Sequence, residues 1–257
     1  MTEKTTTPTT ALCHHTLTSI HYRDRDLVND LLPGGGDFTR VMAEHILGRR
    51  LDDKELRVIN AVLIAVMEHG TTPSAIATRL TYMSAPENLQ GAVAAGLMSV
   101  GSQFVGTMEN NARILDRLVA IADDAARRDA ALAIAREHRE RRQAMPGFGH
   151  HLHKPDDPRA AKLLEIGKGL GLPGRHIEAL ELLAAAVDEV AGRHITINAT
   201  GCCAALLGEI GVPVDLMRGF AVISRAAGLV AHIAEEQQRP SGRFIWDLVD
   251  KSIPHAP

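Results

Sequence analysis

The sequence predicts an all-α fold, and two observations carry this prediction. Aromatic residues make up 3% of the 257 residues and hydrophobic residues 45%, so the core must consist mainly of Ala, Leu, Val and Ile. Interiors rich in Ala and Leu favour closely packed helices, since both residues are strong helix formers. Apolar residues also recur at helical spacing along most of the chain, and no convincing alternating stretch indicates a strand.

Capping residues delimit the helices predicted in the first half. Asp52 with Glu55 matches a capping box, and the helix that follows should end near residue 70. Thr72 and Pro73 are typical of an N-cap and a first helical position. The predicted helices cover about residues 37–47, 52–69, 73–82 and 89–100.

The second half follows the same pattern. A polar helical region spans about residues 112–143, and Asp157 with Pro158 forms another N-cap signal. Further helices are predicted at about 158–170, 174–191, 196–209 and 214–238. The basic segment 239–243 is predicted to be irregular, and residues 1–16 are predicted to be a flexible tail.

Bulk properties exclude several classes of protein. The net charge of −3 provides no basic footprint for nucleic acid, and we identify no apolar run of the roughly 18 residues that span a bilayer. Residues 1–10 lack the apolar core of a secretory signal. Three cysteines do not form a disulfide framework. We therefore expect a cytoplasmic protein without nucleic acid or membrane partners.

The segment from Pro146 to Ala160 concentrates the chemistry. A Gly-Phe-Gly turn presents His150, Lys154 follows four positions later, and Arg159 lies in the first turn of a helix. That position is electrostatically poor for a cation, which favours a functional role over a solvated one. An imidazole, an ammonium and a guanidinium in one segment suit a substrate with carboxylates and phosphates.

This segment resembles the signature of the citrate synthase superfamily, G-[FY]-G-H followed by D-P-R. Three further blocks agree in order and spacing: Glu-His-Gly at 68–70, Phe-Ala-Val-Ile-Ser-Arg at 220–225, and the segment 235–239 followed by Pro240. The resemblance extends from about residue 20 to the C-terminus. It implies large and small helical domains that close over a cleft.

One departure from the family pattern indicates a branch. Synthases resembling this chain carry G-x-x-H-G-G, whose histidine holds the thioester enolate, whereas this chain has Phe104 at the histidine position. Phenylalanine there, together with the short length, resembles the citryl-CoA lyase-like branch, including the lyase module of ATP-citrate lyase.

A second departure affects the proton transfer. Synthases and lyases carry N-x-D, whose Asp exchanges a proton with the thioester α-carbon, but this chain reads Asn198-Ala199-Thr200. A threonine hydroxyl cannot act as a carboxylate base near neutral pH. Thr200 is either an altered proton-transfer position, with Cys203 or water standing in, or simply part of a tightly packed helix start.

The resemblance also implies roles for single residues. His150 would polarise the oxygen of the dicarboxylate half, since histidine both donates hydrogen bonds and titrates near neutrality. Arg159 and Arg225 would bind carboxylates, and His69 would be an active-site residue. Each residue also has a purely structural alternative. His150 would be a turn histidine, and His69 a histidine at a helix C-terminus. Arg159 would be a surface arginine, and Arg225 an arginine paired within the protein.

The resemblance also implies roles at the edge of the site for two further basic residues. Lys154 would contact a CoA phosphate, and Arg239 would reach into the site of a neighbouring subunit, although loop cations are commonly solvated. His151 and His153 invite a metal hypothesis, but no Cys or carboxylate set with zinc spacing surrounds them. We therefore predict no metal and no permanently bound cofactor, with coenzyme A present only as part of the substrate.

The predicted domains follow from the same resemblance. The large domain would comprise residues 17–106 and 211–257, and the small domain residues 107–210. Relatives are homodimers or higher homo-oligomers, and the low-charge helices at 89–100 and 196–209 suit burial in such an interface.

The resemblance implies a carbon–carbon lyase acting on an acyl-CoA. The reference reaction is retro-aldol cleavage of citryl-CoA to acetyl-CoA and oxaloacetate. One alternative is a lyase or hydrolase of a different hydroxyacyl- or ketoacyl-CoA, which the change at Thr200 motivates. The other is a non-catalytic CoA-thioester-binding protein, which would keep His150, Arg159 and Arg225 but dispense with the carboxylate.

Overall fold

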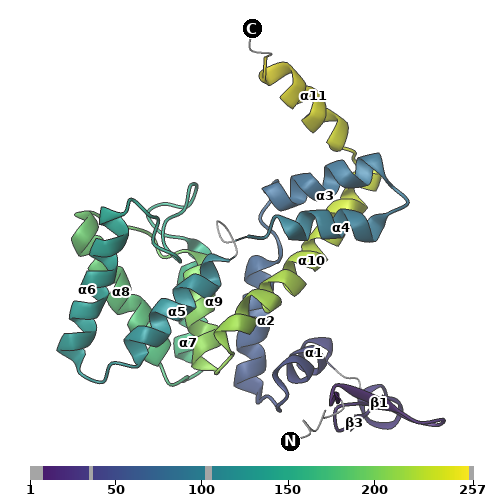
Figure 1. Cartoon of the computed structure of the whole chain (residues 1–257), viewed down its shortest axis with the longest axis horizontal. Helices are drawn as coiled ribbons and strands as arrows, with labels where there is room; N and C mark the ends of the chain where they lie inside the picture. Colours follow the sequence, from purple (N-terminus) through teal and green to yellow (C-terminus); the bar gives the residue numbers. More distant parts are fainter. Residues whose placement is uncertain (1–7, 35–36, 102–105, 255–257) are drawn as a thin grey trace, which may run out of the picture. The chain divides into compact units, whose positions relative to one another are not determined.

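The computed structural model describes residues 8–34, 37–101 and 106–254. The chain forms two compact units, residues 1–60 and 61–257 (Figure 1). Helices account for most of the described residues, which confirms the all-α prediction. The division into large and small domains made from the resemblance stays a prediction.

The first unit contains a small antiparallel sheet that the sequence did not reveal. The strands β1 (Cys13–His15), β2 (Ile20–Tyr22) and β3 (Arg25–Asp26) lie in that order, with Cys13 opposite Tyr22 and His21 opposite Asp26. Strands of two or three residues are too short to show alternation. A π-helical turn (Leu27–Leu31) and α1 (Phe38–Leu47) follow.

Capping contacts fix the starts of the next helices. Before α2 (Asp53–Met67), the backbone N–H of Asp52 donates to Glu55 and that of Glu55 donates to Asp52, at 2.9 and 2.8 Å. This confirms the predicted capping box. Helix α3 (Pro73–Ser84) starts after Thr72 as predicted, and α4 (Leu89–Met98) follows.

The polar region predicted at 112–143 is two helices rather than one. Helix α5 (Thr107–Val119) ends before a short break, and α6 (Asp124–Glu140) begins after Asp123, whose carboxylate accepts from the backbone N–H of Ala126 at 2.7 Å. An N-cap of this kind starts a new helix because it satisfies a first-turn N–H group.

Helix α9 (Ala199–Glu209) is a buried helix of the second unit. It packs against α5, α7 (Pro158–Gly169) and α8 (Arg175–Ala191), and nearly all of its side chains are buried. Packing within the chain buries this low-charge helix, and the homo-oligomer interface stays a prediction. Its N-terminus, where Asn198 is the N-cap, positions part of the site described below.

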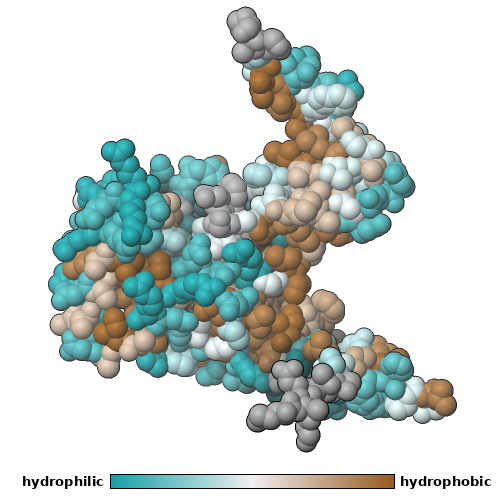
Figure 2. Space-filling view, viewed as in Figure 1, coloured by the Kyte–Doolittle hydropathy of each residue, from teal (hydrophilic) through white to brown (hydrophobic). Residues whose placement is uncertain are grey.

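Helix α10 (Val214–Gln238) packs against α3, α4 and α5. By length and composition alone it is apolar enough to cross a membrane, as core helices of globular proteins also are. The segment predicted to be irregular is so at residues 239–241, but helix α11 (Gly242–Ser252) already begins within it, so the prediction was wrong for its last two residues. Figure 2 shows apolar side chains along α11, where Phe244, Trp246 and Leu248 are exposed. Patches of this kind are typical of interaction surfaces, although the homo-oligomer stays a prediction.

Candidate functional site

A cleft of about 1520 Å³ in the second unit collects most of the predicted site residues. The first residues of α3, α5, α7 and α9 contribute to its lining through Pro73, Thr107, Arg159 and Ala199. Helix N-termini carry partial positive charge and unpaired N–H groups. The described lining residues include four arginines and five histidines and no Asp or Glu, so the cleft is built for an anion.

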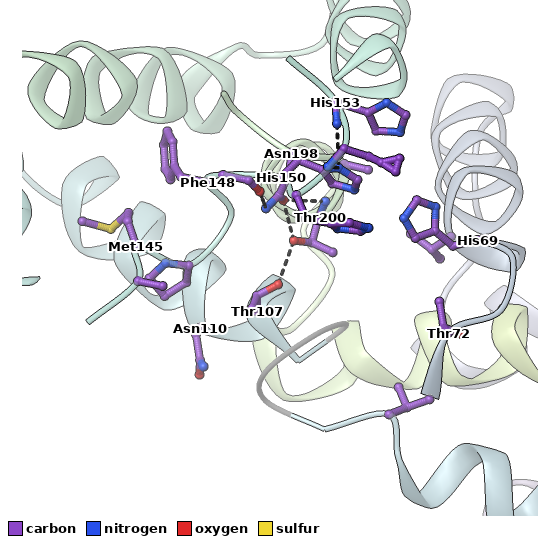
Figure 3. Close-up of a pocket in the computed structure, with 18 of the residues that line it drawn as sticks. His69, Thr72, Thr107, Asn110, Met145, Phe148, His150, His153, Asn198 and Thr200 are labelled. Atoms are coloured by element: carbon purple, nitrogen blue, oxygen red, sulfur yellow. Dashed lines mark hydrogen bonds between the residues drawn. The ribbon is translucent and has the colours of Figure 1, made fainter. Parts of the chain in front are cut away.

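A glycine turn places His150 at the cleft (Figure 3). Gly147 has a φ of +83°, and a Cβ added there would lie 2.9 Å from the Cα of Gly201. The backbone N–H of Gly149 donates to the carbonyl of Thr196 at 2.7 Å, and that of Asn198 donates to the carbonyl of Gly147 at 3.0 Å. These contacts hold the turn against the start of α9, and only glycine permits so close an approach.

The protonation state of His150 follows from its surroundings. Its Nδ1 accepts the backbone N–H groups of Leu152 and His153 at 3.1 and 3.0 Å. Burial, followed by the neighbouring His153, lowers the pKa of His150 to about 4, although Asp157 opposes this shift. The ring is therefore neutral at pH 7, and its proton must sit on Nε2 because Nδ1 is an acceptor.

Asp157 fixes the orientation of Arg159. Its carboxylate, which is 0% exposed, accepts from Arg159 Nε at 3.0 Å and from Nη2 at 2.8 Å. It also accepts the backbone N–H of Arg159, as predicted for the N-cap of α7, and that of Ala199 at the start of α9. One buried carboxylate thus joins two helix N-termini and aims the guanidinium.

The remaining guanidinium hydrogens point toward two histidines. Arg159 Nη1 lies 3.4 Å from His69 Nδ1, and Nη2 lies 3.4 Å from His150 Nε2. Because His150 Nε2 carries a proton, two donors face each other there. An oxygen atom of a ligand placed between them would accept from both, which is the arrangement of an oxyanion or carboxylate site. Burial and the cationic neighbour Arg159 also lower the pKa of His69.

Arg225 lines the cleft, and no carboxylate of the described residues forms an ion pair with it. Its side chain is 5% exposed, and its Nε and Nη1 atoms have no hydrogen-bond partner among the described residues. Burial lowers its pKa, which reports the cost of this environment for a charged group. A buried guanidinium with unpaired nitrogen atoms is best accounted for by an anionic ligand.

Thr200 belongs to a cluster of hydroxyl and amide groups in the cleft lining, beside the His150 turn. Its Oγ1 donates to Asn198 Oδ1 at 2.7 Å and lies 2.8 Å from the Thr107 hydroxyl. Asn198 Nδ2 donates in turn to the carbonyl of Gly149 at 3.0 Å. The threonine side chain therefore lies in the cleft rather than serving only to pack the helix start.

Cys203 cannot replace the missing carboxylate. It is fully buried, and burial raises the pKa of its thiol to about 12, so it is protonated at neutral pH. The hypothesis that Cys203 stands in for a base was therefore wrong. Water, the other stand-in considered for Thr200, stays a hypothesis.

Two predicted site residues among the described residues are not brought into the cleft. Lys154 is exposed next to His153, and Arg239 is exposed at the end of α10, so neither lines the cleft. The predicted role of Arg239 requires a second subunit and stays a prediction. Phe104 lies outside the described residues.

The sequence suggested His151 and His153 only as metal ligands and Thr107 not at all, yet all three line the cleft. His153 stacks on His150 with ring centroids 4.4 Å apart, and His151 stacks on the same ring at 4.7 Å. Among residues 8–34, 37–101 and 106–254, no group of three or more His, Cys, Asp or Glu side chains is arranged to hold a metal ion. Thr107 has no distinguishing motif, and only the fold brings it to Thr200.

Comparison with known proteins identifies the family. Residues 5–246 match the family model described as citrate synthase, C-terminal domain. The chain belongs to this family. It is also 30% identical to citryl-CoA lyase from Hydrogenobacter thermophilus, with a TM-score of 0.78 over 89% of this chain and 86% of that one.

Relatives with lower sequence identity are longer proteins, and this chain matches only part of each. A putative citrate synthase 2 from Mycobacterium tuberculosis is 27% identical over 203 residues, which are 76% of this chain and 52% of that protein. The chain thus spans about half the length of the curated citrate synthases it matches. ATP citrate lyase from Methanosaeta concilii, solved with (3S)-citryl-CoA, shares the fold with a TM-score of 0.76 at 18% identity, over all of this chain and 42% of that one.

Proposed function

We propose that this member of the citrate synthase family cleaves a carbon–carbon bond of a carboxylated 3-hydroxyacyl-CoA, with citryl-CoA as the reference substrate. One observation carries the proposal: the described cleft lining holds four arginines and five histidines without a carboxylate. Such a lining suits a substrate with several anionic groups. The 30% identity to a citryl-CoA lyase supports the choice of reaction.

The cationic groups have separate tasks in this reaction. Arg225 binds one carboxylate of the substrate, and Arg159 binds a second one with the orientation that Asp157 sets. The 3-hydroxyl oxygen lies near the Nε2–H of His150, which stabilises the negative charge that develops there. Holding the substrate in this geometry supplies much of the rate enhancement.

Proton transfer involves the remaining lining residues. His69 is the candidate base for the 3-hydroxyl, since its lowered pKa leaves it unprotonated at neutral pH. When the bond breaks, its electron pair forms the thioester enolate, which must gain a proton at carbon. With no Asp or Glu in the described lining, that proton comes from a hydroxyl group or from water near Thr200 and Thr107.

Coenzyme A enters this scheme only as part of the substrate. Lys154 is proposed to contact a CoA phosphate from its exposed position beside His153. Arg239 is proposed to complete the site of a neighbouring subunit in a homo-oligomer.

Mass spectrometry of the purified protein incubated with citryl-CoA tests the proposal. We expect acetyl-CoA above the uncatalysed background, and its loss in His150→Ala. Thr200→Val is a second test variant, because it removes the candidate proton-donating hydroxyl while preserving the shape. The control is Arg128→Met, which breaks only an exposed ion pair with Glu189 outside the cleft and should keep the activity. Intact citryl-CoA after incubation would reject citryl-CoA as the substrate.

The absence of a carboxylate at Thr200 favours a second candidate, an enzyme for a different hydroxyacyl- or ketoacyl-CoA. If Thr200→Asp gains no citryl-CoA cleavage, this candidate is favoured over simple impairment. Ligand binding by calorimetry without turnover across a panel of CoA thioesters would instead identify a non-catalytic CoA-thioester-binding protein.

A further inference from the structure

The turn that carries His69 is held from behind by Glu68. One carboxylate oxygen, Oε1, accepts the backbone N–H groups of both His69 and Gly70 at 2.7 Å. The Nε2 atom of His232 lies 3.1 Å from each carboxylate oxygen. Glu68 itself does not line the cleft, so its carboxylate serves the turn rather than a ligand.

His232 is fixed in one tautomer by Arg79. The Nε atom of Arg79 donates to His232 Nδ1 at 2.9 Å, so the ring proton lies on Nε2 and is donated to Glu68. Both residues are almost fully buried. Arg79 also forms ion pairs with Glu235 and Glu236, so His232 joins Glu68 to a guanidinium that has carboxylate partners of its own.

The same chain of contacts continues to the start of α11. Glu236 Oε1 accepts the backbone N–H groups of Ser241 and Gly242 at 2.8 and 2.7 Å. Contacts therefore run without interruption from the His69 turn, through Glu68, His232 and Arg79, to the junction of α10 with α11. Networks of this kind orient the groups they support because each member has its hydrogen bonds satisfied.

We propose that Glu68 and His232 are positioning residues that hold His69 at the cleft, and that Glu68 takes no part in acid–base chemistry. The two N–H groups bound by Glu68 flank the His69 peptide, so they set the direction in which its side chain leaves the backbone. The kinetic part of this inference rests on the proposed function, whereas the orientation of His69 does not.

A matched pair of variants separates positioning from packing. His232→Gln keeps an acceptor for Arg79 and a donor for Glu68, whereas His232→Leu removes both. We expect His232→Leu to lower kcat for citryl-CoA cleavage by about ten- to a hundredfold with KM little changed. We expect His232→Gln to retain most of kcat. Equal losses of kcat in both variants would contradict the proposal.

Glu68→Gln tests the exclusion of acid–base chemistry. A positioning residue leaves the shape of the kcat–pH profile unchanged, because His69 still supplies the titrating group. A general base at Glu68 would instead cost about 10²- to 10⁴-fold in kcat and remove the acidic limb of the profile. That result would overturn the proposal.

The orientation of His69 is measurable without any turnover. The NMR signals of the His69 ring, titrated in the ligand-free protein, should shift in His232→Leu and stay near wild type in His232→Gln. Unchanged signals in His232→Leu would overturn the inference. Shifted signals in a protein that cleaves no thioester would sustain the positioning role and refute only the proposed reaction.

Discussion

Arg159 and Arg225 line the same cleft, but their surroundings differ sharply. Arg159 is held by two hydrogen bonds to the buried Asp157, whereas Arg225 is more deeply buried and has two unpaired nitrogen atoms among the described residues. Burial lowers the pKa of Arg225, and the charge of Glu68 opposes this shift. One guanidinium therefore has its direction set by the protein, whereas the other keeps unpaired donors that the proposed substrate carboxylate would complete.

Removing Arg159 should therefore have the largest effect on stability. Arg159→Met leaves the Asp157 carboxylate buried without its cationic partner, and we expect the free energy of unfolding to fall by about 3 kcal/mol. Urea denaturation at pH 7 measures this. The control is Arg128→Met, which breaks an exposed ion pair with Glu189 and should cost below about 1 kcal/mol.

Removing Arg225 should affect the ligand rather than the fold. Arg225→Met eliminates an unpaired buried charge, so the free energy of unfolding should be unchanged or higher. The stabilisation by citryl-CoA should be lost, which at a ligand concentration of a hundred times Kd amounts to about 2.7 kcal/mol. Thermal denaturation with and without ligand measures both. A destabilised Arg225→Met protein would mean that Arg225 has a structural partner.

Protonation of His150 should change the free energy of unfolding by a smaller amount, and this change depends on pH. Its pKa is about 4 in the folded protein and near 6.5 in the unfolded chain. The unfolded state therefore binds more protons between these values, and His150 lowers the free energy of unfolding as the pH falls from 6.5 toward 4. NMR titration of His150 checks this, with His194 as the control because Asp188 and Asp156 raise its pKa. A His150 midpoint near 6.5 would contradict the neutral-donor role.

Modification or removal of the cysteine thiols should have the smallest effect on activity. Cys202 and Cys203 are buried with raised pKa values, whereas Cys13 is exposed. A thiol reagent applied to the folded protein should modify Cys13 alone, and Cys203→Ala should keep its activity. Rapid modification of a second cysteine would show that α9 opens readily.

The sequence predicted site residues and helix starts correctly where a local motif marks them. The glycine turn, the Asp157-Pro158 helix start and the apolar helix around Arg225 placed His150, Arg159 and Arg225 as candidates before their proximity was known. Helix bounds were predicted well where a cap and a proline coincide, as at Pro73 and Pro158. Local chemistry decides these features, so local sequence reveals them.

Contacts between distant segments were not predictable in the same way. The pairing of Thr107 with Thr200 and that of Arg79 with Glu236 join residues 93 and 157 positions apart. No periodicity connects such positions, because tertiary packing alone brings them together. Helix α11 was missed for a different reason: Pro240 and Gly242 are typical of a loop, but the helix begins at Gly242 itself.

The contact between Gly147 and Gly201 has a consequence for redesign. A Cβ on Gly201 would lie 2.6 Å from the carbonyl oxygen of Gly147, so backbone rather than side chains sets the separation of the His150 turn from the start of α9. Side chains on either side can then be exchanged without altering that spacing. The backbone thus keeps the distance between the His150 turn and α9 constant while individual side chains of the site are replaced.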